Sequence, residues 1–511
     1  MPKKDYSLLQ NGSDVRGIAT DGVQGETVNL TKEAAKDVAA AFAVWLKDKT
    51  GKDKVRISVG HDSRISAPTL LQGVVDGITK TGNDAEITYL SSTPSMFMLL
   101  QDENRCSDGS VMITASHLPF NRNGLKFFTK EGGLESKDIK TLLTLAEDGA
   151  TCAEEKGKVE EKPYLDEYAA SLVQFVRTSC GKDKPLSGKK ILVDAGNGAG
   201  GFYAEKVLIP LGADVSGSQF LEPDGTFPNH VPNPENKEAM RSVCEAVKKS
   251  KADFGIIFDT DVDRAGAVDE NGEEINRNRL IALISSILLK EKAGTIVTDS
   301  VTSDGLTEFI QAKGGKHHRF KRGYKNVINE AIRLNNEGEY TPLAIETSGH
   351  AALKENYFLD DGAYLITRLL IALAKASEQG QSLTAVLKEL PEAKEADEVR
   401  FKFHSGVDFK TLGNQIIASL KSYASTLPYI RLAEKDYEGV RLNFDKDHGN
   451  GWLLVRLSLH DPILPTNAES ASVGGVQTIF AWLREFLTRF DGLDVSAAAK
   501  YIDNTPKKIN E

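Results

Sequence analysis

Short apolar segments alternate with helical patterns in three separate stretches of the chain, and this alternation limits the fold more than any other feature. Residues 31–47 carry apolar side chains at helical spacing, residues 54–60 alternate as a strand, and further helix and strand patterns continue to residue 101. Similar runs begin at residues 190–194 and 294–298. Strands that alternate with helices favour layered α/β domains. Functional loops of such folds leave the strand ends, so polar residues that follow apolar segments are the first candidates for a site.

The last part of the chain has a different pattern. Strand-like segments at residues 399–403, 439–444 and 452–457 surround helical patterns at 409–423 and 473–490, which is typical of an α+β domain. A length of 511 residues allows several domains. We predict α/β domains at residues 1–184, 185–292 and 293–396 and an α+β domain at 397–511.

The stretch Thr114-Ala-Ser116-His117-Leu-Pro-Phe-Asn-Arg-Asn123-Gly124-Leu-Lys126 follows a predicted strand end. Ser116 offers a hydroxyl nucleophile, His117 and Lys126 offer proton carriers, and Asn123-Gly124 predicts a turn. A second loop, at residues 11–17, displays Arg16, a residue type that binds phosphate through two parallel hydrogen bonds. Each stretch is also compatible with an ordinary polar surface loop without chemistry.

The apolar segment at residues 254–258 runs directly into Asp259-Thr-Asp261-Val-Asp263-Arg264. Alternate residues of an extended segment point the same way, so we expect the three carboxylates to converge on one Mg²⁺ or Ca²⁺ ion. Three alternatives stay open: an exposed acidic loop, a calcium loop completed by Glu270, and an aspartyl-phosphate phosphatase. The calcium loop would need glycine in place of Arg264. The phosphatase would use Asp259 as nucleophile and Asp261 as acid, with Asp360-Asp361 as a second acidic pair.

Two further groups of residues suggest sugar and phosphate binding. Glu346-Thr-Ser348-Gly-His350 opens from a predicted strand and offers a carboxylate, a hydroxyl and an imidazole to sugar hydroxyls. The basic turn at residues 321–325 ends in Lys325 and precedes a helical pattern, where an anion is favoured. In the last domain we expect a loop from Arg456 to Asn467, in which Arg456, Ser458 and Asn467 could hold a phosphate.

Charge and cysteine content exclude several classes of function. The net charge is −10 and basic residues form no long tract, so no nucleic-acid surface is expected. The 4 cysteines show no paired spacing and suggest reduced thiols. The chain has no signal-peptide pattern and no run of about 18 apolar residues, so no membrane span is expected. We predict a cytoplasmic protein, or an organellar one if a transit peptide has been removed.

Taken in order, these motifs resemble the α-D-phosphohexomutase superfamily, the phosphoglucomutase/phosphomannomutase enzymes. The stretch from Thr114 to Lys126 looks like the phosphoserine loop of that family, the stretch from Asp259 to Arg264 like its metal loop, and Glu346-Thr-Ser-Gly-His350 like its sugar loop. The resemblance covers nearly the whole chain. Two departures are that Leu118 replaces the usual Asn, and that Leu-His460-Asp-Pro follows Ser458 where Asn-Thr-Glu-Pro is common.

The resemblance implies three similar αβα sandwich domains plus a C-terminal α+β domain of the TATA-box-binding-protein-like type, around a central cleft. It implies reversible phosphoryl transfer between C1 and C6 of a glucose or mannose phosphate, through phosphoserine at Ser116 and a hexose 1,6-bisphosphate. Glucose 1,6-bisphosphate would be the activator, Mg²⁺ the metal, hexose phosphates the only partners, and the protein a monomer or dimer. Alternatives are a phosphoglucosamine mutase, the phosphatase built on Asp259, and a silent sugar-phosphate sensor.

The resemblance also implies roles for individual residues. The expected catalytic residues are Ser116, His117, Lys126, Arg16 and His350. The expected metal ligands are Asp259, Asp261, Asp263 and a phosphate oxygen on Ser116. The expected substrate-binding residues are Arg264, Lys325, Glu346, Ser348, His350, Arg456, Ser458 and Asn467.

Overall fold

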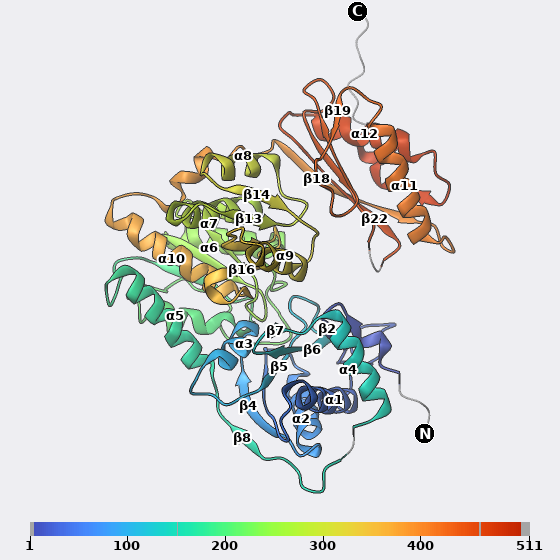
Figure 1. Ribbon diagram of the computed structural model, residues 1–511. Helices are drawn as coiled ribbons and strands as arrows, with labels where there is room; N and C mark the ends of the chain where they lie inside the picture. The colour runs from blue at the N-terminus through green and yellow to red at the C-terminus, as the bar shows by residue number, and fades with distance from the viewer. Residues whose placement is uncertain (1–4, 151, 459–460, 502–511) are drawn as a thin grey trace, which may run out of the picture. The chain divides into compact units, whose positions relative to one another are not determined.

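The computed structural model describes residues 5–150, 152–458 and 461–501 (Figure 1). The chain divides into two compact units, each described by itself below. The first unit comprises Met1–Leu280 and Ser348–Ala385, and the second comprises Ile281–Thr347 and Val386–Glu511. The fold is the mixed α/β architecture with a C-terminal sheet-rich domain that the sequence predicts. The domain boundaries stay predictions.

The first sheet of the first unit has the strand order β1-β2-β6-β5-β3-β4-β8. Its central strands are parallel, and β2 and β6 run antiparallel to their neighbours. The short β7 (Gly132–Gly133) pairs with β6. The strands of this order are β1 (Gln10–Asn11), β2 (Asp14–Ile18), β3 (Arg56–His61), β4 (Asp84–Leu90), β5 (Gly109–Ile113), β6 (Arg122–Thr129) and β8 (Val159–Glu161).

Helices cover this sheet because their apolar faces pack on it. They are α1 (Lys32–Thr50), α2 (Ala67–Lys80), α3 (Thr93–Gln101) and α4 (Ser136–Asp148). The Thr31 hydroxyl caps α1 by accepting the Ala34 amide, and Gly51 ends it in the left-handed conformation. Helices α1 and α2 approach closely, since a Cβ on Gly77 would lie 2.1 Å from the Lys36 carbonyl oxygen.

The second sheet of the first unit has the order β12-β11-β10-β9 and positions the acidic motif. Its strands are β9 (Ile191–Asp194), β10 (Phe254–Phe258), β11 (Ala265–Val268) and β12 (Glu274–Ile275). Strands β9 and β10 are parallel, whereas β10 and β11 form an antiparallel hairpin. Residues 259–264 are therefore the hairpin connection, and they form a compact turn rather than the extended segment that we expected.

Further elements complete the first unit. The glycine-rich residues after β9 lead into a short π-helical segment, Tyr203–Leu208. The remaining elements are α5 (Leu165–Cys180), α6 (Lys237–Ser250), the β16–β17 hairpin (Ala351–Leu353 and Leu359–Asp360) and α10 (Gly362–Glu378). Helices α5 and α10 lie side by side (Figure 1), and Phe175 stacks on Tyr364 between them.

The second unit begins within α7 (Arg277–Glu291) and contains parallel strands in the order β14-β13-β15. These strands are β13 (Thr295–Thr298), β14 (Lys316–Arg319) and β15 (Leu343–Ile345), with helices α8 (Asp304–Ala312) and α9 (Tyr324–Asn336) between them. Because the strands are parallel, the residues that follow them leave the same edge of the sheet, among them Asp299, Phe320 and Glu346.

The C-terminal sheet has the order β19-β20-β21-β22-β18-β23. Its strands are β18 (Glu395–Phe403), β19 (Ile430–Leu432), β20 (Val440–Phe444), β21 (Gly451–Val455), β22 (Ile463–Ser470) and β23 (Leu493–Asp494). Helices α11 (Phe409–Ala424) and α12 (Gly475–Leu487) bury one face of the sheet in a shared core. Strand β22 was not predicted from the sequence, which led us to expect a loop across most of it.

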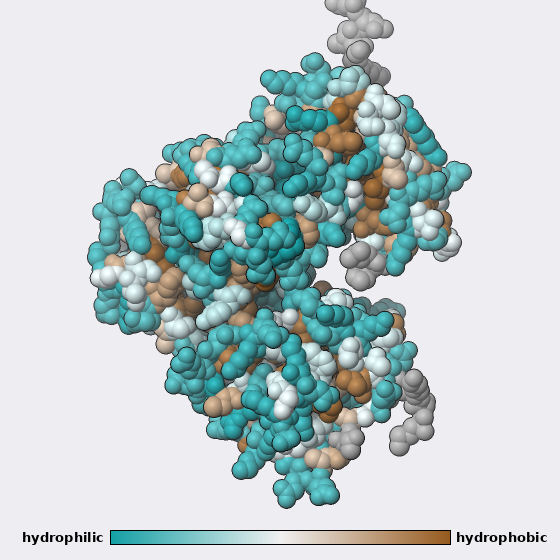
Figure 2. Space-filling model, viewed as in Figure 1, coloured by the Kyte–Doolittle hydropathy of each residue, from teal (hydrophilic) through white to brown (hydrophobic). Residues whose placement is uncertain are grey.

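Apolar side chains gather in the interior cores of both units. The face shown in the space-filling view is mostly hydrophilic, with scattered apolar residues (Figure 2). Within the described part of the chain, no helix combines the length and the apolar character that crossing a membrane requires.

Candidate functional site

Ser116 lies in the turn between β5 and β6 in a conformation that few serines adopt. Its φ is 51°, in the left-handed region, and the residue is buried. The Ser116 amide donates to Thr114 Oγ1 at 2.9 Å. The hydroxyl donates to Asp259 Oδ2 at 2.9 Å and accepts from Arg264 Nη2 at 2.9 Å. The structure therefore aims the predicted nucleophile at the acidic motif.

Arg264 connects the acidic motif to Ser116. Its Nε and Nη2 donate to Asp259 Oδ2 at 3.1 and 2.9 Å, and its Nη1 donates to Asn233 Oδ1 at 3.3 Å. Although burial opposes the charged form, the neighbouring carboxylates raise the pKa of Arg264. The guanidinium thus remains a fixed positive charge beside the Ser116 hydroxyl.

The three carboxylates of the acidic motif fit a divalent cation. One oxygen from each of Asp259, Asp261 and Asp263 lies within 4.8 Å of the others, and all three residues are buried. Asp261 Oδ1 and Asp263 Oδ1 are buried without a hydrogen-bond partner, a costly state that a bound cation would relieve. Val262, with φ 67°, bends the turn so that the carboxylates converge. Oxygen-only ligands of this kind suit Mg²⁺.

Two side chains of the first domain bind these carboxylates directly. Lys126, buried on β6, donates from Nζ to Asp261 Oδ2 at 3.1 Å and to Asp263 Oδ2 at 2.5 Å. Thr93, the first residue of α3, donates its hydroxyl to Asp261 Oδ2 at 2.5 Å and its amide to the Asp261 carbonyl at 2.8 Å. The ammonium and the two carboxylates form a buried charge cluster next to Ser116.

Two histidines near this cluster have opposite protonation tendencies. Burial, helped by the Arg264 and Arg16 charges, lowers the pKa of His117 to about 3. Its Nδ1 lies 3.4 Å from Ser116 Oγ. Burial also opposes charging of His350, but Asp360 and Asp263 outweigh it and raise its pKa to about 9. At neutral pH, His117 is therefore the neutral imidazole and His350 the charged one.

The segment that carries Ser348 and His350 packs against the exit of the acidic turn. A bridge joins Arg264 to His350, and a Cβ on Gly349 would lie 2.7 Å from the Ala265 carbonyl oxygen. His350 Nδ1 lies 2.5 Å from Asp360 Oδ2. His350 is thus held between strands β11 and β17.

In the second unit, Glu346 follows β15, and Lys325 lies in the helix that follows β14. Glu346 is buried, and its Oε1 accepts the Gly323 amide at 2.6 Å, just before α9. Lys325 lies in the first turn of α9. The buried Asp299, at the end of β13, accepts the Thr347 hydroxyl at 2.7 Å. Glu346 and the start of α9 therefore lie at the same edge of this sheet.

Arg456 and Asn467 lie on the face of the C-terminal sheet opposite its helical core. Arg456 follows β21, its backbone amide donates to the Pro465 carbonyl at 3.1 Å, and its Nε is buried without a hydrogen-bond partner. Burial and the nearby Arg322 guanidinium lower its pKa. Asn467 Nδ2 donates to Glu398 at 3.1 Å, while its Oδ1 is buried without a partner. A bound ligand or an ordered water would satisfy these two buried polar atoms.

Two other residues of the predicted phosphate loop, Ser458 and His460, give less information about a ligand site. Ser458 Oγ accepts the Asp461 amide at 3.2 Å, and the Ser458 amide donates to the Ile463 carbonyl at 3.2 Å. The loop thus ends at Ile463, so Asn467 belongs to β22 and not to the loop that we expected. His460 lies outside the described residues.

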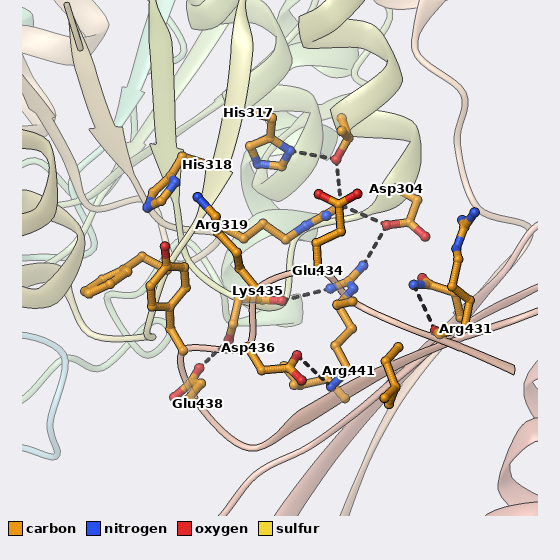
Figure 3. Close-up of a pocket in the computed structure, with 18 of the residues that line it drawn as sticks. Asp304, His317, His318, Arg319, Arg431, Glu434, Lys435, Asp436, Glu438 and Arg441 are labelled. Carbon is orange, nitrogen blue, oxygen red and sulfur yellow. Dashed lines mark hydrogen bonds and ion pairs between the residues drawn. The ribbon is translucent and has the colours of Figure 1, made fainter. Parts of the chain in front are cut away.

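A cavity of about 640 Å³ lies elsewhere in the second unit, beside α8, β14 and the β19–β20 connection (Figure 3). Arg319 and Arg441 converge on Asp304, each donating to Oδ1 at 2.9 Å (Figure 3). The residues that line the cavity include no predicted site residue.

Two predicted loops are strands in the structure. Arg16 lies on β2, where its Nη2 donates to Asp14 at 2.9 Å, instead of projecting from a loop. Asn123 and Gly124 lie within β6 and do not form a turn. The chain turns earlier, where the Arg122 amide donates to the Pro119 carbonyl at 3.0 Å. A Cβ on Gly124 would lie 2.4 Å from the Val15 carbonyl oxygen, so close strand packing explains this glycine.

The rival interpretations of the acidic motif do not match the geometry. A strand precedes it, and Glu270 accepts a hydrogen bond from Ser382 at 2.9 Å instead of joining the cluster, so no calcium loop forms. Asp361 caps α10 and accepts the Tyr168 hydroxyl at 2.7 Å. It is a structural residue rather than a second acid of a phosphatase.

Sequence reasoning missed three residues that contact the site: Arg64, Thr93 and Asp360. Arg64 donates to the Ser116 backbone carbonyl, Thr93 holds Asp261, and Asp360 holds His350. Arg64 and Thr93 each follow a predicted strand, so the rule that led to Ser116 would also have identified them. Asp360 was noted only as part of the phosphatase alternative.

Comparisons with known proteins show which family the chain matches. Residues 9–149, 166–272 and 276–393 match the alpha/beta/alpha domains I, II and III of phosphoglucomutase/phosphomannomutase. The chain is 31% identical over 469 residues to a phosphoglucomutase of Neisseria meningitidis, covering 91% of this chain and 94% of the relative. It is 31% identical to a phosphomannomutase/phosphoglucomutase of Pseudomonas putida, covering 89% and 93%.

Solved structures of the family have the same fold. A phosphoglucomutase/phosphomannomutase family protein of Burkholderia thailandensis is 25% identical, with a TM-score of 0.75 and coverage of 98% and 99%. The open form of a Paramecium phosphoglucomutase, 16% identical, has a TM-score of 0.71 with coverage of 98% and 96%. The chain belongs to the phosphoglucomutase/phosphomannomutase family of the α-D-phosphohexomutase superfamily.

Proposed function

We propose that the protein is a phosphohexomutase that interconverts hexose 1-phosphates and hexose 6-phosphates through phosphoserine at Ser116. One observation carries this proposal. The Ser116 hydroxyl lies between Asp259 and Arg264, beside a carboxylate cluster that fits a divalent cation. Phosphoryl transfer depends on positioning and on charge stabilisation, and this arrangement offers both.

The phosphoryl group would move from Ser116 to the free hydroxyl of the hexose phosphate, which loses its proton to a basic side chain. The resulting hexose 1,6-bisphosphate would turn over and return its other phosphate to Ser116. Asp259, Asp261 and Asp263 would hold Mg²⁺, which supplies neutralisation of phosphate charge when bound. Arg264 would bind a phosphoryl oxygen in place of the Ser116 hydroxyl.

Proton transfer would involve the side chains that surround Ser116. Lys126, His117 and His350 are the candidates, with Arg16 providing a fixed charge near His117. Neutral His117 is suited to accept a proton and charged His350 to donate one, according to their lowered and raised pKa values. We assign the acceptor role to His117 and the donor role to His350 or to the Lys126 ammonium.

Substrate recognition would depend on residues outside the Ser116 turn. Glu346 and Ser348 would bind the hydroxyls of the sugar, and Arg456, Ser458, Asn467 and Lys325 would bind the phosphate that does not react. Glucose and mannose differ only at C2, so groups that bind the neighbouring hydroxyls would accept both sugars. The family relatives include a protein named for both activities. We propose glucose and mannose phosphates as substrates and glucose 1,6-bisphosphate as activator.

A mass measurement tests the proposal. The purified protein would be incubated with glucose 1,6-bisphosphate, and its intact mass and phosphopeptides determined. We expect one added phosphate, roughly 80 Da, on Ser116, and turnover of glucose 1-phosphate and mannose 1-phosphate in a coupled assay. Phosphate on Asp259, labile to hydroxylamine, would contradict the proposal in favour of a phosphatase. No phosphate and no turnover would favour a sugar-phosphate sensor.

A further inference from the structure

The guanidinium of one buried residue, Arg64, binds the backbone of the turn that carries Ser116. Arg64 lies in the connection between β3 and α2, and its side chain has an exposed fraction of 0%. Its Nη1 donates to the carbonyls of Pro119 and Arg122 at 2.8 and 2.9 Å. Its Nη2 donates to the carbonyls of Leu118, at 2.6 Å, and of Ser116 itself. One side chain therefore binds four backbone oxygens of the turn.

These contacts matter because the turn is conformationally costly. A left-handed φ at a non-glycine residue costs on the order of 1–3 kcal/mol unless the surroundings hold it. The Ser116 amide donates a hydrogen bond to Thr114 Oγ1 at 2.9 Å, and the Ser116 carbonyl accepts one from Arg64. Only a planar guanidinium presents five donors in a fixed fork. A lysine at this position would keep the charge but could not reach all four carbonyls.

The second domain seals this guanidinium from solvent. The Phe227 ring lies 5.3 Å from the guanidinium carbon of Arg64. Two residues earlier, a Cβ on Gly225 would lie 2.5 Å from the Ser63 carbonyl oxygen, so the two backbones touch. Residues 223–230 precede α6, and Pro223, Thr226, Pro228 and Asn229 among them are exposed. In the structure, they cover the residue that holds the nucleophile.

A carboxylate completes the arrangement around Arg64. Asp62 Oδ1 accepts the Arg64 amide at 2.9 Å, and its Oδ2 lies 3.3 Å from Arg64 Nε. Both side chains are fully buried. A buried pair of this kind contributes little to stability but orients its members. Asp62 therefore fixes the direction in which the guanidinium points.

We propose that Arg64 is a positioning residue for phosphoryl transfer, which holds the Ser116 backbone in its left-handed conformation so that Oγ lies between Asp259 and Arg264. Phe227 protects this contact from water. The inference rests on the proposed function, because the position of Oγ matters only if Ser116 carries the phosphoryl group. Arg64 acts through the backbone of Ser116 and makes no contact with the substrate.

Arg64→Lys and Arg64→Ala test the inference, with Arg105 as a matched control. Arg105 is a buried arginine of the same domain that donates to two backbone carbonyls, of Lys162 and Pro163, and lies over the Tyr164 ring at 5.0 Å. It contacts no residue of the Ser116 turn among its described bonds. Substituting Arg105 therefore disturbs the core to a similar degree without loosening the nucleophile.

We expect Arg64→Lys to lower kcat for glucose 1-phosphate by about 100-fold, because small displacements of a reacting group have effects of this size. KM should stay within about threefold, since substrate contacts are unchanged. Added guanidinium ion should restore part of the turnover of Arg64→Ala, which a general loss of folding would not allow. Arg105→Lys should keep its kcat within about threefold, and Arg105→Ala should show no rescue.

A kcat of Arg64→Lys equal to that of Arg105→Lys, or a loss confined to KM, would overturn the inference. If the Arg64 variants do not fold, Phe227→Ala replaces them, and it should lower kcat about tenfold at unchanged KM. Unchanged kcat in Phe227→Ala would then overturn the inference. A wild-type protein without turnover or phosphorylated Ser116 would instead overturn the proposed function, so the two failures are distinguishable.

Discussion

Lys126 and a divalent cation require the same two carboxylates, and this competition gives a quantitative prediction. Lys126 Nζ donates to Asp261 and Asp263, whose other oxygens have no hydrogen-bond partner. Two unit charges 4 Å apart interact by about 4 kcal/mol at an effective dielectric constant of 20. If a third of this repulsion acts on the bound cation, removing the ammonium stabilises the metal complex by ~1.4 kcal/mol, a tenfold gain in affinity.

We therefore expect Lys126→Met to bind Mg²⁺ at least about tenfold more tightly than the wild type, although its turnover falls. Isothermal titration calorimetry on metal-free protein measures this affinity directly. The matched control is Lys130→Met, which removes the same charge at an exposed position just beyond β6. Equal or weaker Mg²⁺ binding by Lys126→Met would refute the argument that the ammonium competes with the metal.

Three further predictions follow from the site and the C-terminal sheet. Ser116→Ala should abolish turnover yet shift the thermal midpoint little, because Asp259 and Arg264 still pair with each other; turnover near the wild-type level would contradict the mechanism. Asp261→Asn should lose activity and Mg²⁺ affinity together, so an unchanged Mg²⁺ dependence of turnover would exclude this ligand. Burial raises the pKa of Glu469 to about 7 although Trp452 donates to it, so its contribution to stability is present below pH ~4.5 and is lost as pH rises through ~7. Glu469→Gln should therefore raise the urea midpoint relative to wild type more at pH 8 than at pH 5, and equal differences at the two pH values would refute this.

The sequence predicted the elements well where periodicity was long and strong. Helix α1 begins and ends close to the predicted residues, and the apolar segment 254–258 is β10. Strand β22 was missed because its residues do not alternate clearly between apolar and polar. The Asn123-Gly124 pair was misassigned because close packing of β2 against β6, which the sequence does not show, requires the glycine.

The site could be predicted in part, since Ser116, Asp259, Asp261 and Asp263 follow strands and the structure brings them together. Residues that act through backbone contacts could not be predicted in the same way. The carbonyls that Arg64 binds come from a turn about fifty residues further along the chain, and their direction depends on the turn geometry. Sequence patterns report which side chains are present, whereas carbonyl directions arise only on folding.

The division of the chain between Thr347 and Ser348 has a consequence for engineering. It separates the groups proposed to transfer phosphate, all in the first unit, from Lys325, Glu346 and Arg456 in the second. The second unit consists of residues 281–347 and 386–511, so it could be exchanged as a cassette between relatives. Such chimaeras would be expected to take the Glu346 contact to the sugar from the cassette donor, and the Ser348 contact and the metal requirement from the recipient.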